Sequence, residues 1–91
     1  MTMTPKEAYE FAEKYDSSDE IRKIACQDPY YAYVYARNID KESRDDTREA
    51  ACKAPLYAYY YALTVDKSPH EKTREAACKE VYCAYDYAQY I

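Results

Sequence analysis

Three of the four cysteines recur at a fixed spacing, and cysteine is the residue type in this chain best suited to metal binding or disulfide formation. Cys26, Cys52 and Cys78 each follow an alanine and stand at equal intervals along the chain. Equivalent side chains of stacked helices lie about 9–10 Å apart, whereas a disulfide needs Cα atoms within about 7 Å and zinc needs sulfurs at about 2.3 Å. We therefore predict three small, buried core residues with free thiols, and no metal site. An approach of Cys78 to Cys83 across one helical turn stays open as the less favoured alternative.

The remaining reactive side chains do not suggest catalysis. His70 is the only histidine, so the chain offers no histidine pair for a proton shuttle. Asp45 and Asp46 are adjacent carboxylates, but they fall where the helix dipole favours acidic residues in a first turn. A glycosidase-like use of carboxylates would need a cleft with opposed walls. No enzyme, catalytic residue or cofactor is predicted.

An internal 26-residue repeat runs through most of the sequence. The heptapeptide 47–53 (TREAACK) reappears unchanged at 73–79, and 21–27 is a diverged copy. Each copy is followed by a Tyr/Ala signature of the form Ala-Tyr-x-aromatic-Ala, at 32–36, 58–62 and 84–88, and a fourth signature stands alone at 8–12. We name the charged segments A and the Tyr/Ala segments B; the chain then reads B followed by three A–B pairs.

This order predicts an all-α fold, a short right-handed α-solenoid of about seven helices in one domain of residues 1–91. Ala32, Tyr35, Ala36 and Ile39 follow the i, i+3, i+4, i+7 spacing of one helical face, and the other repeats copy it. A lone first helix at 5–15 is followed by helix pairs within 18–39, 44–65 and 69–91. The individual helices are expected at 5–15, 18–27, 29–39, 44–53, 55–65, 69–79 and 81–90. Thr4-Pro5, Asp28-Pro29 and Ser68-Pro69 are read as helix starts.

Charge and composition limit the class of partner. The net charge is −4 and the pI is near 5.0, which disfavours binding to a phosphate backbone. The longest mainly apolar run, 55–65, is too short to cross a bilayer. Glycine is absent, which argues against tight hairpins. We therefore expect a cytoplasmic protein that binds neither nucleic acid nor membrane.

The B signature, as in 29–37 (PYYAYVYAR) and 55–62 (PLYAYYYA), resembles short Tyr/Ala-rich helical repeats of tailed bacteriophages and bacteria. The resemblance covers nearly the whole chain, but the charged A segments depart from the commoner pattern. It implies a viral origin, and hence a host cytoplasm. It also implies a small protein that occupies a host protein, in the manner of anti-CRISPR inhibitors.

The tyrosines separate into framework and surface positions on a helical wheel. Tyr35, Tyr61 and Tyr87, with Phe11, fall on the face of the core alanines. Tyr9, Tyr33, Tyr59 and Tyr85 lie about 100° to one side and are expected to pack between repeats. The positions that point away from both groups are charged in the first B segment, mainly apolar in the next two, apart from Arg37, and partly polar in the last. We call the six predicted partner-binding residues the outward face: Tyr30, Val34, Leu56, Tyr60, Leu63 and Tyr82.

Two functions follow from this pattern. The first is a protein–protein interaction module that uses the outward face, with Tyr60 as its central residue, to bind a partner with a basic surface, such as a host enzyme or defence complex. The second is a structural module whose uncapped repeat ends stack into a homodimer or larger homo-oligomer. Coverage of these residues by A helices remains the alternative to an exposed face.

Overall fold

Seven α-helices make up the computed structural model of this protein, which describes residues 3–91. They are α1 (Pro5–Lys14), α2 (Asp19–Ala25), α3 (Pro29–Tyr35), α4 (Asp45–Ala51), α5 (Pro55–Tyr61), α6 (Glu71–Ala77) and α7 (Val81–Tyr90). Two of them continue as π-helices: η1 (Ala36–Asp40) extends α3, and η2 (Ala62–Asp66) extends α5. No strand occurs within residues 3–91, so the all-helical prediction is confirmed.

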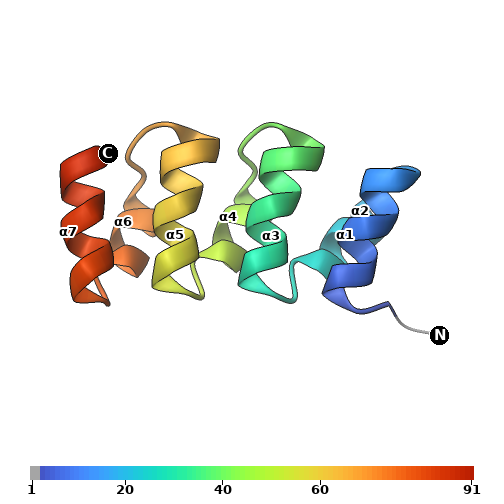
Figure 1. The fold of residues 1–91 in the computed structure, drawn as a ribbon, viewed down its shortest axis with the longest axis horizontal. Helices are drawn as coiled ribbons and strands as arrows, with labels where there is room; N and C mark the ends of the chain where they lie inside the picture. The colour runs from blue at the N-terminus through green and yellow to red at the C-terminus, as the bar shows by residue number, and fades with distance from the viewer. Residues whose placement is uncertain (1–2) are drawn as a thin grey trace.

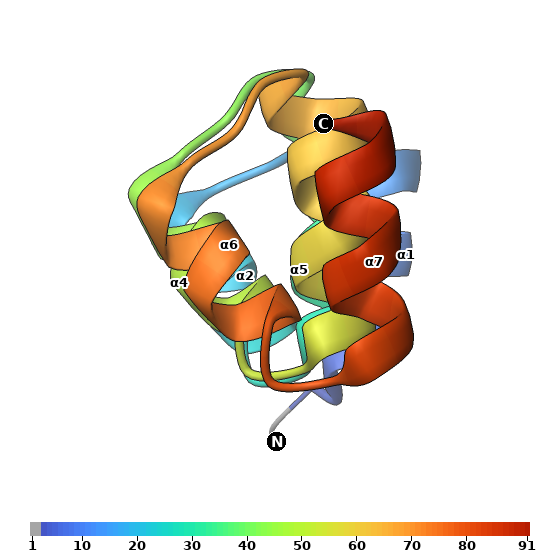
Figure 2. The same ribbon diagram turned by 90° about the vertical axis from the view of Figure 1, so that its left-hand side faces the viewer.

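The helices form two layers. The B segments α1, α3, α5 and α7 stand side by side in chain order, and the A segments α2, α4 and α6 lie behind them (Figure 1). Figure 2 shows the same layers from the α7 end of the row. Each A helix packs mainly on the B helix that precedes it in the chain. Its contact with the B helix that follows is less extensive. The molecule measures 41 × 21 × 16 Å, and its long axis runs along the row of B helices.

Alanine allows the two layers to approach closely. Ala25 and Ala51 in the A layer and Ala32, Ala58 and Ala62 in the B layer are fully buried. Larger side chains fill the space around them: Tyr35 and Tyr61 are the largest fully buried residues, and Tyr87 is also buried. The assignment of these three tyrosines to the core is confirmed. Phe11 is exposed instead, because no A helix precedes α1 among the described residues.

Capping groups explain where several helices begin. Thr4 and Glu7 form a reciprocal capping box at α1, and the Asp28 side chain accepts a hydrogen bond from the Tyr30 N–H at α3. The predicted start of α6 at Ser68-Pro69 is wrong: the helix begins at Glu71, after His70. The Tyr87 hydroxyl binds both the N–H and the C=O of His70, which keeps that residue extended.

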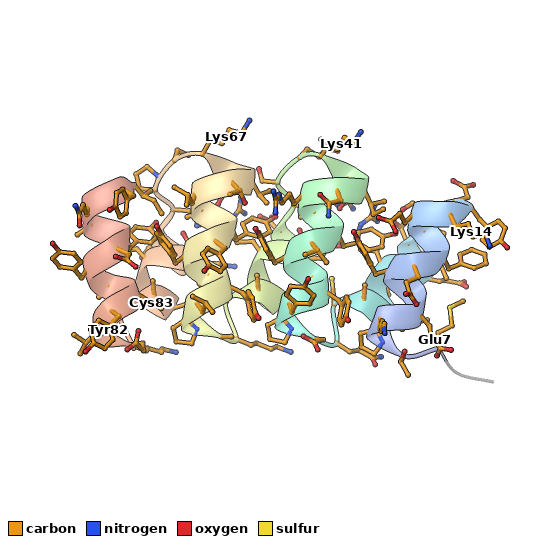
Figure 3. All side chains as sticks on the ribbon, in the orientation of Figure 1. Glu7, Lys14, Lys41, Lys67, Tyr82 and Cys83 are labelled. Carbon is orange, nitrogen blue, oxygen red and sulfur yellow. The ribbon has the colours of Figure 1, made fainter. Side chains whose placement is uncertain are left out.

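The ends of both π-helices use lysine where other proteins commonly use glycine. Lys41 and Lys67 have φ angles of 56° and 57°, the left-handed region that glycine adopts at the lowest steric cost. A hydrogen bond of 2.8 Å from the Lys41 N–H to the Ala36 carbonyl closes the first of these turns. Both lysines lie at the same edge of the row (Figure 3).

Candidate protein-binding surface

Four residues of the outward face are exposed, and three of them occupy the same place in successive B helices. Tyr30 of α3, Leu56 of α5 and Tyr82 of α7 recur at the repeat interval, and all three side chains are exposed. Leu63 of η2 is the fourth. Figure 3 shows Tyr82 at the foot of α7. The repeat therefore places Tyr30, Leu56 and Tyr82 along one edge of the B layer, and Leu63 lies two helical turns beyond Leu56.

The other two residues of the outward face lie between helices. Val34 is buried in a cluster with Tyr33 and Ala36, so the prediction that it points outward is wrong. Tyr60 is half-buried, with its ring centroid 5.9 Å from that of Tyr33 and 5.5 Å from that of Tyr59. Side chains at this position reach back to the preceding B helix instead of facing solvent. Tyr60 is consequently a packing residue and not the centre of an exposed patch.

A network of tyrosine rings contacts Tyr30, one of the exposed residues. The Tyr30 ring centroid lies 4.9 Å from that of Tyr31 and 5.4 Å from that of Tyr57, both in edge-to-face geometry. Tyr57 in turn stacks on Tyr33, with 6.1 Å between ring centroids. Aromatic contacts of this kind contribute about 0.5–1.5 kcal/mol each beyond the area they bury. The surface around Tyr30 is therefore held in place by α3 and α5 together.

Two buried ion pairs fasten the A layer to the ends of the π-helices. The Arg22 guanidinium binds the Asp40 carboxylate, and Arg48 binds Asp66, each with a closest N–O distance of 2.7 Å. The two aspartate side chains are only 5% and 4% exposed. Hydrogen bonding to these carboxylates raises the pKa of both arginines. The sequence analysis missed these pairs, although the arginine and the aspartate are separated by the same interval in both repeats.

The hydroxyls of the buried tyrosines are also used within the framework. Tyr61 accepts a hydrogen bond from the Arg44 N–H at 2.9 Å, and its oxygen lies 2.7 Å from the Thr47 hydroxyl. Tyr87 makes the same contacts with His70 and Thr73, both at 2.9 Å. Burial raises the pKa of Tyr61 above its usual value of 10.0. These hydroxyls are satisfied internally and are not available to a ligand.

The cysteines are placed differently from the prediction. Cys26 and Cys52 are half-buried and Cys78 is exposed, so the expectation of three buried thiols is wrong. Each is the C-cap of its A helix, one residue after the fully buried alanine, and so is turned about 100° away from the core. Cys83 is the buried one, and it packs beside Tyr59. All four are free thiols, and burial raises the pKa of Cys26 and Cys83 to about 11.

Polar groups elsewhere are engaged with one another. A hollow of about 520 Å³ is lined by Ser43, Arg44, Asp45, Asp46 and Arg48. Its arginines already contact carboxylates, Arg44 with Asp46 at 3.4 Å and Arg48 with Asp45 at 2.9 Å. His70 caps α6 by accepting from the Lys72 N–H. Within residues 3–91, no three His, Cys, Asp or Glu side chains gather as metal ligands would.

The outer face of α7 is more exposed than the sequence predicted. Tyr33 and Tyr59 are 7% exposed, as expected for residues between repeats, but the equivalent Tyr85 is 66% exposed. Val81 and Tyr90 of α7 are exposed as well. The prediction that Tyr85 packs between repeats is wrong. It rested on the equivalent positions of Tyr33 and Tyr59, but a tyrosine at this position is buried only where another B helix follows.

No protein-family model, curated protein or solved structure matches this chain. The resemblance to phage Tyr/Ala repeats therefore stays a prediction. No described helix combines the length and the apolar character that crossing a membrane requires.

Proposed function

We propose that this chain is a short α-solenoid that acts as a non-catalytic protein-interaction module and binds its partner through Tyr30, Leu56, Leu63 and Tyr82. The observation that carries the proposal is the exposure of an apolar side chain at one position in three successive B helices. Aromatic and large aliphatic residues supply the core of protein interfaces, and their exposure on three neighbouring helices therefore favours an interface.

The shape of this surface favours a protein over a small molecule. Small ligands bind in concave pockets with mainly apolar walls. The hollow of about 520 Å³ described above is instead lined by polar and charged residues of the α4 region and by none of the four exposed residues. Leu63 lines a second hollow, but that one measures only about 120 Å³. The exposed residues of the outward face lie along the edges of neighbouring helices, a layout that suits an extended partner surface.

Charge indicates the kind of partner. The chain has a net charge of −4, and the acidic side chains of Glu10 and Glu13 are exposed on α1, the first helix of the row. A partner with an apolar patch bordered by basic groups would complement this arrangement. The narrower hypothesis of a phage-encoded inhibitor that targets a host enzyme or defence complex rests on the motif resemblance and on this charge.

The test is affinity capture from a bacterial lysate with matched variants. Leu56→Ser/Leu63→Ser removes two exposed apolar side chains without touching the ring network. Its control, Lys23→Ser/Lys53→Ser, changes two exposed residues of the A layer. The same protein should be retained by wild type and control, and its affinity for the Leu56/Leu63 variant should fall at least tenfold, about 1.4 kcal/mol. Equal binding by all three would refute the proposed surface.

A further inference from the structure

The outer face of α7 is exposed, although its tyrosine and alanine have buried counterparts in the two preceding B segments. Tyr33 of α3 is covered by the following B helix, with its ring centroid 6.1 Å from that of Tyr57 and 5.9 Å from that of Tyr60. Tyr59 of α5 is likewise buried, in a cluster with residues of α7. Tyr85 occupies the same position of α7 and is 66% exposed. Figure 2 shows α7 in front, with no described helix on its outer side.

The residues around Tyr85 make this face apolar. Val81 and Ala88 are exposed and, with Tyr85, follow the i, i+4, i+7 spacing of one helical stripe. Ala36 and Ala62 occupy the position of Ala88 in the two preceding B segments, and both are fully buried. Asp86 is the single charged residue of α7, and it occupies the position from which Tyr60 reaches back to the preceding helix. The outward stripe therefore carries no charge.

The opposite end of the row has the reverse character. The signature at 8–12 aligns with that at 32–36, which places Glu7, Glu10 and Lys14 of α1 where later B helices carry residues that contact the preceding helix. All three side chains are exposed. Figure 3 shows Glu7 and Lys14 at the α1 end and Tyr82 at the other end. Head-to-tail stacking would bury these charges against the apolar α7 stripe, and burying unpaired charges is costly.

We propose that α7 pairs with α7 of a second copy around a two-fold axis, so that the protein forms a closed homodimer. Only this pairing matches the apolar stripe with an apolar stripe, and a two-fold contact uses each face once and does not extend into a filament. The inference goes beyond the proposed function, because it concerns Val81, Tyr85 and Ala88 at the end of the row, whereas the proposed function rests on Tyr30, Leu56, Leu63 and Tyr82.

The area of the outer face of α7 limits the expected affinity of the dimer. The cross-section of the molecule perpendicular to the row is 21 × 16 Å. This is small beside the about 800 Å² that each partner buries in a standard interface. We therefore expect a dissociation constant in the micromolar range, so that monomer and dimer exchange within an accessible concentration range.

The test is sedimentation velocity over a concentration series from about 1 µM to about 1 mM. The wild-type protein should pass from a 10.7 kDa monomer to a dimer and no further. Tyr85→Glu should weaken the dimer at least tenfold. Tyr15→Glu is the matched control, because Tyr15 is 67% exposed at the α1 end, and it should leave the dimer unchanged.

Circular dichroism should show native helix content for both variants, and Ala88→Glu replaces Tyr85→Glu if the latter does not fold. A wild-type protein that stays monomeric at the highest concentration would overturn the proposal. Growth beyond a dimer that Tyr15→Glu abolishes would overturn it too, in favour of end-to-end stacking.

Discussion

The helix pairs α4–α5 and α6–α7 have closely related sequences but differ in how deeply their side chains are buried. Residues 47–53 and 73–79 are identical, and both B helices carry the Tyr/Ala signature. Yet Arg48 and Tyr59 are buried, whereas Arg74 and Tyr85 are exposed. Tyr61 and Tyr87, by contrast, are buried in both pairs. Tyr59 is therefore buried because another B helix follows it, whereas Arg48 is buried because it pairs with Asp66 of η2, an extension that α7 lacks.

The largest difference is expected for the arginines. Arg48→Ala leaves the Asp66 carboxylate buried without a partner and should lower the free energy of unfolding by about 4 kcal/mol. Arg74→Ala should change it by no more than about 0.5 kcal/mol, since Arg74 is exposed and forms no ion pair within residues 3–91. Urea unfolding followed by circular dichroism measures both. Similar losses for the two variants would break the distinction between the middle and the end of the row.

A smaller difference is expected for the tyrosines between repeats. Tyr59→Ala should cost about 3 kcal/mol, because it opens a cavity between α5 and α7. Tyr85→Ala should cost less than about 1 kcal/mol when unfolding is measured well below the dissociation constant of the proposed dimer. The comparison fails if Tyr85→Ala destabilises the monomer as much as Tyr59→Ala does.

The smallest effect is expected for the hydroxyls of Tyr61 and Tyr87, which should contribute equally in the two helix pairs. Tyr61→Phe and Tyr87→Phe each remove a hydroxyl that binds a backbone N–H and a threonine within the same pair. Each should therefore cost about 1–2 kcal/mol, and the two values should agree within error. Thermal unfolding of the two variants side by side provides the measurement. A large difference would mean that the pairs are not equivalent internally.

The amino-acid sequence determined the features that depend on neighbours along the chain. The 26-residue repeat, the helical periodicity, the Thr4 and Asp28 caps and the core role of Tyr35 and Tyr61 all follow from spacings of a few residues. The B segments lie within about one residue of their predicted bounds when η1 and η2 are counted with α3 and α5; the change to π-helix at Ala36 and Ala62 was not predicted. Local hydrogen bonds and side-chain periodicity are sufficient for such predictions.

Only the tertiary structure decided which repeated positions are covered. It placed Val34 between helices, buried Cys83 in place of the three repeated cysteines, and brought Arg48 to Asp66. It also left Tyr85 exposed at the end of the row. A helical wheel gives the direction of a side chain relative to its own helix axis. Burial depends in addition on the helix that packs against that direction, which the position within a repeat does not specify.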